Sequence, residues 1–177
     1  MLGNALPILG IIKLTSGGVI MNIDKTYKIP DEAMIFGLLL IVSNKMNTLL
    51  EREFKEFDVT TKQWFLSETI NSLFNSPPTL KEAANAMGSS HQNIKQVAVK
   101  LQEKGLLLLE KDKKDARVTR LKTTEQSGDF WKQTDYKGAI FREKMFKEID
   151  AHDITITRHL LEKMLSNLTE IENADND

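Results

Sequence analysis

The sequence predicts a mainly α-helical protein that carries one small β-hairpin, and three observations lead to this fold class. Two capping boxes, in which a Thr is followed three residues later by Gln or Glu, mark helix starts at Thr60 and Thr79. The short stretch Gly88–Ser90 separates the helix that starts at Thr79 from a third helical pattern. Two runs of strand-forming residues, 106–111 and 117–123, are joined by the charged turn "DKKD".

The composition sets outer limits on the function. The chain has 177 residues, 41% of them hydrophobic, which suits one domain with a sizeable core or a small domain with extensions. It has no cysteine, which excludes disulfides, thiolate metal sites and thiol redox switches. The longest apolar run, Ala33–Val42, is shorter than a membrane span, and Leu6–Ile12 lacks the flanks of a secretory signal. We therefore expect a cytoplasmic protein with no membrane partner.

Residues 1–28 show no clear helical or strand period, and Thr15–Val19 indicates a turn or linker. We interpret this segment as an N-terminal extension and expect native translation to start at Met21. The other interpretation is an ordered arm that packs on a partner.

The first helix is predicted to begin at Pro30 and to run to about Phe57. It is apolar on nearly every face through Val42, and such a helix has to be buried on more than one side. In a small protein this indicates burial against a second chain. We therefore assign 29–57 and 125–172 to a helical dimerisation region.

The dimerisation region includes two predicted C-terminal helices, roughly 125–149 and 154–172, followed by a disordered tail at 173–177. The last helix has an apolar stripe at helical spacing: Leu160, Leu161, Met164, Leu165, Leu168 and Ile171.

Three helices are predicted between these regions. The first starts at Thr60 and ends before "NSPP", the second runs from Thr79 to Gly88, and the third runs from Ser90 to Gly105. The side chains expected to face inward from the first are Trp64, Phe65, Ile70, Leu73 and Phe74.

The last two of these helices have the spacing of a helix-turn-helix. Ala84 is small enough for close helix approach, Gly88 suits a left-handed turn, and Ile94 locks the second helix onto the core. Val97, Ala98 and Leu101 continue the inward face. With the following hairpin, residues 58–124 are predicted to form a winged helix-turn-helix.

The opposite face of the helix beginning at Ser90 presents Gln92 and Gln96 between Lys95 and Lys100. Amide side chains can pair with adenine in a major groove, and lysines can meet phosphate or guanine. Residues 79–124 hold ten Lys or Arg against five Asp or Glu, a net charge of +5, whereas the whole chain is −1. This distribution favours a polyanion-binding centre. A solvated helix face that merely lacks acids is the alternative.

The segment from Thr79 to Thr124 resembles the winged helix-turn-helix of the MarR family of bacterial transcriptional regulators. "GSSHQNIKQVAVKLQEKGLL" is similar to the family's recognition helix, "DARVTRLKTTE" to its D-x-R wing, and "TTKQWFL" to the start of its second helix. The sequence departs from the family at Thr123, where Leu is usual, and by one additional residue in "EQSG".

The resemblance implies a sequence-specific regulator of transcription, a repressor released by a small effector, that binds double-stranded DNA as a homodimer. The recognition helix would be 90–104 and the wing 110–122, with Arg117 in the minor groove, Asp115 orienting it, and Lys113 and Lys114 on phosphates. The predicted DNA contacts are Ser90, His91, Gln92, Asn93, Lys95, Gln96, Lys100, Lys113, Lys114, Asp115, Arg117 and Arg120. Amide pairing with adenine and an arginine in a narrow minor groove predict an A·T-rich inverted repeat as the target.

Many members of the family release DNA when a small aromatic molecule enters a cleft. Trp64, Phe65, Trp131 and Phe141 are the candidate walls of such a cleft, although each also fits an ordinary core position. We expect no cofactor and no resident metal.

Three alternatives concern other functional classes. The sequence has no Gly-rich phosphate loop, no G-x-S-x-G motif and no cysteine nucleophile, which argues against an enzyme. A metal-responsive regulator would draw on His152, Asp153 and His159. A winged-helix module for protein contacts would lack DNA affinity at any salt concentration, whereas a DNA binder weakens steeply as salt rises.

Overall fold

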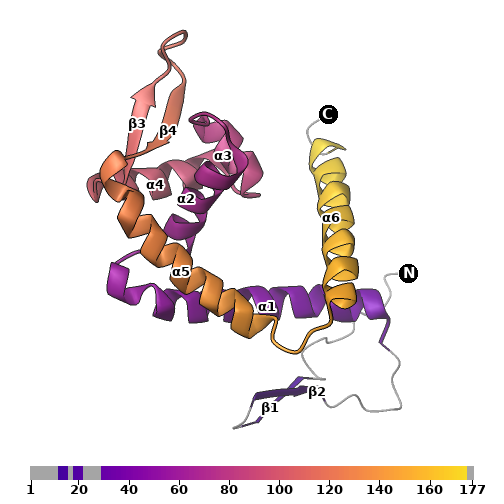
Figure 1. Ribbon diagram of the computed structural model, residues 1–177. Coiled ribbons are helices and arrows are strands. Elements are labelled where there is room, and N and C mark those ends of the chain that lie inside the picture. The colour runs from indigo at the N-terminus through magenta and orange to yellow at the C-terminus, as the bar shows by residue number, and fades with distance from the viewer. Residues whose placement is uncertain (1–11, 16–17, 22–28, 175–177) are drawn as a thin grey trace. The chain divides into compact units, whose positions relative to one another are not determined.

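The computed structural model describes residues 12–15, 18–21 and 29–174 (Figure 1). The chain divides into two compact units, residues 1–134 and residues 135–177. The predicted fold class is confirmed, since the described part is mainly helical and includes a two-stranded antiparallel hairpin in the winged segment. The N-terminal extension differs from expectation, because β1 (Ile12–Thr15) and β2 (Gly18–Met21) pair as antiparallel strands around the predicted turn.

Helix α1 (Asp31–Glu53) continues into a short 3₁₀ turn (Lys55–Phe57). Leu50 and Phe54 are buried at its end, and the side-chain carboxylate of Glu51 accepts a hydrogen bond from the backbone N–H of Thr61 at 2.8 Å. Large apolar side chains along the rest of α1 are exposed: Phe36, Leu38, Leu40, Val42, Met46 and Leu49. By length and composition alone, the whole of α1 is long and apolar enough to cross a membrane. Its continuous apolar run, Ala33–Val42, is shorter than a membrane span.

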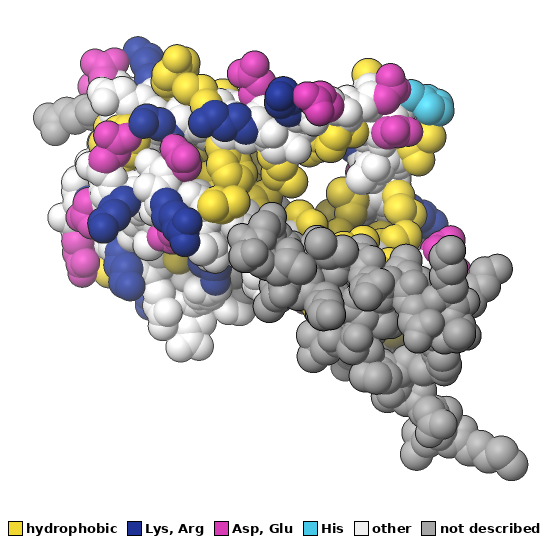
Figure 2. Space-filling model, turned by 90° about the horizontal axis from the view of Figure 1, so that it is seen from below, with side chains coloured by type: hydrophobic (Ala, Val, Ile, Leu, Met, Phe, Trp, Pro, Cys, Tyr) yellow, Lys and Arg dark blue, Asp and Glu magenta, His cyan; other side chains and the backbone are white. Residues whose placement is uncertain are grey.

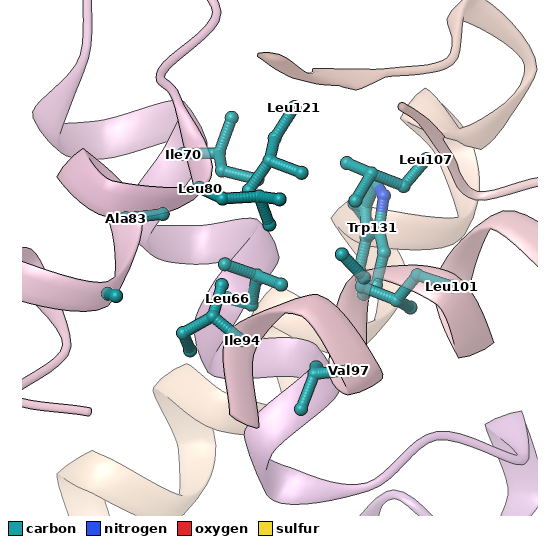
Figure 3. Packing of buried hydrophobic residues seen from close by; sticks show 12 residues of the cluster. Leu66, Ile70, Leu80, Ala83, Ile94, Val97, Leu101, Leu107, Leu121 and Trp131 are labelled. Carbon is teal, nitrogen blue, oxygen red and sulfur yellow. The ribbon is translucent and has the colours of Figure 1, made fainter. Parts of the chain in front are cut away.

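The core of the first unit lies among α2 (Thr61–Leu73), α3 (Leu80–Ala86), α4 (His91–Glu103) and the hairpin. Figure 3 shows its side chains converging from these elements and from α5 (Gly128–Met145), which contributes Trp131. Both predicted capping boxes are present, with Thr60 and Gln63 bonded reciprocally and Thr79 and Glu82 likewise. Local sequence signals therefore set the starts of α2 and α3.

The inward face of α2 differs from the sequence-based expectation. Leu66 and Ile70 are buried together with the polar side chains of Gln63 and Ser67, whereas Phe65 is 45% exposed and Leu73 is 65% exposed. The buried positions follow the helical spacing i, i+3, i+4, i+7, and this register leaves Phe65 on the other side. The prediction that Phe65 and Leu73 face inward is wrong for this unit.

The wing consists of β3 (Leu107–Lys111) and β4 (Thr119–Thr123), which pair antiparallel with Leu109 opposite Leu121. The base of β4 is also attached to the loop before α3. Thr79 forms a bridge with Arg120, and the backbone N–H of Leu121 donates to the carbonyl of Pro78 at 2.8 Å. This loop therefore acts as a short third strand beside the hairpin.

A 3₁₀ turn, Glu125–Ser127, precedes α5 and lies where the sequence has one residue more than the MarR pattern. The second unit contains the rest of α5 and α6 (Ala151–Ala174), on which the apolar stripe is largely exposed. Hydrophobic side chains open to solvent are visible on the face of the molecule in Figure 2. The predicted boundaries, 125–149 and 154–172, are close to these helices.

Candidate nucleic-acid interface

Helix α4 is fixed to the core along one face only. Ile94, Ala98 and Leu101 are at most 1% exposed, and Val97 is 9% exposed. Gly88 has a φ of +56° in the turn before the helix, a conformation that glycine adopts without steric cost. The hydroxyl of Ser90 accepts a hydrogen bond from the backbone N–H of Asn93 at 3.2 Å and caps the helix. The helix-turn-helix predicted from these spacings is confirmed as a structure.

The other face of α4 is open. Gln92 and Gln96 are exposed, and so are Lys95 and Lys100 on either side of them. The described residues of α4 carry no acidic side chain before Glu103. The helix therefore presents amide donors and acceptors between two cations, a combination that can read base edges and meet phosphates.

The turn of the wing holds its arginine in an outward position. Arg117 donates from Nε and Nη2 to the two carboxylate oxygens of Asp115, both at 3.0 Å, in a bidentate pair. This pairing lowers the pKa of the Asp115 carboxyl and raises the pKa of the Arg117 guanidinium. The Arg117 side chain is 91% exposed, so the pair orients the arginine without burying it.

A second pair lies at the base of the same turn. Asp112 forms a short hydrogen bond and ion pair with the Nε of Arg120. The Nη1 of Arg120 also donates to the carbonyl oxygen of Pro77 at 2.8 Å. The Asp112 side chain is 14% exposed, and the Arg120 guanidinium and the turn's N–H groups lower its carboxyl pKa to about 2. Sequence reasoning missed Asp112, although an Asp at the first position of a turn can accept the backbone N–H two residues further on, as in an Asx turn.

The structure brings the predicted contact residues onto α4 and the wing of one unit. Nine of them are exposed: Ser90, His91, Gln92, Lys95, Gln96, Lys100, Lys113, Lys114 and Arg117. Three are half-buried and have partners within the protein: Asn93, Asp115 and Arg120. Asn93 donates to the Ser89 hydroxyl at 3.0 Å, so its amide also stabilises the helix start.

This arrangement recurs in solved structures of transcriptional regulators. A MarR protein from Peptoclostridium difficile superposes with a TM-score of 0.69 at 22% identity, covering 81% of this chain and 90% of that one. The S. aureus MepR–DNA complex gives a TM-score of 0.66 at 18% identity, over 74% of this chain and 94% of that one. The organohalide-sensing regulator RdhR, bound to 2,4-dichlorophenol, gives 0.70 at 15% identity, over 81% and 85%.

The chain has the MarR fold. No protein-family model matches the sequence, so the likeness is one of structure. The regions that carry the resemblance in sequence, the helix 90–104 and the wing 110–122, form the second helix of the helix-turn-helix and the hairpin of this fold.

Two grooves lined mainly by polar and charged residues lie beside α4. The first, about 300 Å³, is lined by residues of α1, of the start of α2 and of α4, among them Glu51, Lys62 and Gln96. The second, about 580 Å³, lies further along α4 and includes Asp58 and Lys104, whose ion pair measures 2.9 Å. Lys62 was not among the residues predicted to contact DNA, yet it shares the first groove with residues that were.

The four aromatic side chains suggested as walls of an effector cleft do not line either groove. Trp131 is 4% exposed and belongs to the core. Trp64 packs on Phe54, with 5.0 Å between the centroids of the two rings. Phe65 is exposed on α2, and Phe141 belongs to the second unit.

The histidines do not gather with other ligands in the described part of the MarR fold. Residues 12–15, 18–21 and 29–174 contain no group of three or more His, Cys, Asp or Glu side chains placed to hold a metal ion. His159 lies beside Arg158, with Nε2 2.9 Å from the guanidinium Nη2.

Proposed function

We propose that this protein is a sequence-specific, double-stranded DNA-binding regulator of transcription. The observation that carries the proposal is the open face of α4, where exposed Gln92 and Gln96 lie between Lys95 and Lys100 on a helix anchored by its opposite side. A helix held in this way can enter a major groove without losing its packing. The exposed Arg117 supplies a second reader for the adjacent minor groove.

The proposal includes a homodimer. Apolar side chains are exposed along α1 and, in the second unit, along α6, including Phe36, Leu40, Leu165 and Leu168. Exposed apolar side chains at this density mark a surface that a partner covers. A two-fold axis would place two copies of α4 in successive major grooves, about one helical turn apart, so the target is an inverted repeat.

The base preference follows from the two readers. Glutamine amides pair bidentately with adenine N6 and N7, and an arginine in the minor groove favours the narrow groove of A-tracts. The target is therefore A·T-rich. The protein acts in the cytoplasm, where bacterial DNA lies.

Release of the DNA by a small molecule, with the protein acting as a repressor, is the finer part of the proposal. The fold is shared with RdhR, whose solved form holds 2,4-dichlorophenol. In this chain, the groove lined by Glu51, Lys62 and Gln96 adjoins the recognition helix, so an occupant there would compete with or displace the DNA. Adding 2,4-dichlorophenol to a preformed DNA complex and following its dissociation tests this part separately.

The main experiment is a selection of bound sequences from random duplexes, followed by affinity measurements on the selected site and on a scrambled site across a salt series. We expect an A·T-rich inverted repeat and binding that weakens steeply with salt. A protein-interaction module would show little DNA affinity at any salt concentration. A G·C-rich or non-palindromic motif would contradict the assignment of α4 and Arg117 as readers.

A further inference from the structure

Arg120 has a guanidinium that is directed into the protein, which separates it from the other basic residues of the wing. Its Nε binds Asp112, and its Nη1 donates to the carbonyl of Pro77 at 2.8 Å. Its side chain is 37% exposed, against 91% for Arg117. The planar fork of an arginine can serve both acceptors at once, which the single ammonium of a lysine does less well.

Asp112 connects this arginine to the tip of the wing. While one carboxylate oxygen binds Arg120, the other accepts the backbone N–H groups of Lys114 at 2.8 Å and Asp115 at 3.1 Å. The backbone N–H of Asp112 donates to the carbonyl of Val118 at 3.0 Å, which closes the turn. One aspartate therefore fixes the backbone of the residue that orients Arg117.

The other end of the connection is the loop between α2 and α3. Pro77 accepts the Arg120 hydrogen bond, and Pro78 accepts the backbone N–H of Leu121. Thr79, the next residue, is the N-cap of α3, and its hydroxyl and backbone N–H form the capping box with Glu82. The wing is thus tied to the first helix of the helix-turn-helix.

We propose that Asp112 and Arg120 are positioning residues for DNA binding, which hold the wing at a set angle to the helix-turn-helix so that Arg117 reaches the minor groove while α4 occupies the major groove. This inference rests on the proposed DNA-binding function and assigns Arg120 a role other than direct contact. A loosened wing would still carry its positive charge, but Arg117 would lose its fixed register relative to α4.

The substitution Asp112→Asn separates a positioning role from a simple effect of charge, because the two predict opposite changes in DNA affinity. It removes a negative charge from a DNA-facing hairpin, so simple electrostatics predicts tighter binding. We call the hydrogen bonds of Asp112 and Arg120 to each other, to the turn and to Pro77 the clamp. Loss of the clamp predicts weaker binding to the selected site. Glu110→Gln is the matched control, because Glu110 is an exposed acid on β3 that lies opposite Arg120 in the strand register but makes none of the hydrogen bonds described for Asp112 and Arg120. Its substitution removes the same charge from the same part of the hairpin.

The decisive measurement is a double-mutant cycle on the selected duplex. In the parent, Arg117→Ala should weaken binding by about 5- to 150-fold. In the Asp112→Asn and Arg120→Lys backgrounds, which already bind less tightly, the same change should cost much less, because the arginine no longer reaches its groove. The Glu110→Gln background should retain the full effect, and thermal unfolding would verify that each variant is folded.

Three outcomes separate the possibilities. If Arg117→Ala weakens binding as much in both clamp variants as in the parent, the positioning role is overturned. Parent-like binding by Arg120→Lys also overturns it, because a lysine could replace an arginine that only contacts a phosphate. If Arg117→Ala has no effect in the parent itself, the proposed function of the wing fails instead. Hydrogen exchange then reports on the clamp without DNA. Asp112→Ala, which removes the oxygen that accepts both amides, should speed exchange at the backbone N–H groups of Lys114 and Asp115, and Glu110→Gln should not.

Discussion

Replacing Leu101 by Ala tests whether the two faces of α4 are separable, one for folding and the other for DNA. Leu101 is completely buried and belongs to the core cluster that also contains Trp131 and Leu107 (Figure 3). Removing such a side chain costs the transfer free energy of the lost methyl groups and leaves a cavity where neighbours cannot collapse fully. We expect a loss of about 2–5 kcal/mol in the free energy of unfolding.

The loss would be a large part of the stability of a domain, typically about 5–15 kcal/mol. Urea denaturation, followed by tryptophan fluorescence, gives the measurement, because one of the two tryptophans is Trp131 in the same core. Parent and variant are compared at one protein concentration, since the stability of a dimer depends on concentration. Gln102→Ala is the matched control, because Gln102 is the exposed next residue of the helix and should change stability by no more than about 0.5 kcal/mol.

Under conditions where both variants are folded, each should select the same base sequence as the parent, because the outward side chains of α4 are untouched. A destabilisation below about 1 kcal/mol would contradict the packing described for Leu101. A changed base preference in Leu101→Ala would contradict the separation of the two faces, because the buried side chain would then affect what the exposed ones read.

Four further predictions address the DNA-binding and dimerisation surfaces. Arg117→Ala should weaken binding to the selected site by about 5- to 150-fold and leave the thermal midpoint nearly unchanged, because the side chain is exposed; parent-like binding in a fluorescence-anisotropy titration would exclude it as a reader. Lys113→Ala should weaken all duplexes alike and reduce the slope of log affinity against log salt by about 1, and an unchanged slope would remove it from the phosphate contacts. Gln92→Ala and Gln96→Ala should each relax discrimination at one base pair per half-site by about 1–3 kcal/mol, and a repeated selection that returns the parent motif would show that neither amide reads a base. Leu165→Glu, which places a charge on an apolar face, should shift the protein from dimer towards monomer or aggregate in sedimentation, whereas retention of the parent mass would place the interface elsewhere.

Local signals predicted much of the helix-turn-helix because they act within a few residues. The capping boxes at Thr60 and Thr79 and the left-handed turn at Gly88 each depend on side chains or backbone next to the helix end. The inward face of α4 followed from Ile94 and Leu101 at helical spacing. For these features the sequence contains the geometry almost directly.

Tertiary contacts decided the features that the sequence did not predict. The inward face of α2 depends on which side meets α3 and α4, and the choice placed Gln63 and Ser67 inside while Phe65 stayed exposed. The role of Arg120 depends on the carbonyl of Pro77, which is 43 residues away in the chain. A count of basic residues cannot show that one of them is directed inward, so Arg120 was grouped with the DNA contacts.

Helix α1 raises a choice between a membrane and a second copy of the chain as the cover for its apolar side chains. Its length and composition are compatible with a membrane span. However, the continuous apolar run Ala33–Val42 would extend only about 15 Å as a helix, half of a hydrocarbon core of about 30 Å. Beyond it, Asn44, Lys45 and Asn47 are exposed, and burying them in lipid would require removing their water without a partner. A second protein chain can cover the apolar stripe and leave these polar groups in water, so we favour the homodimer.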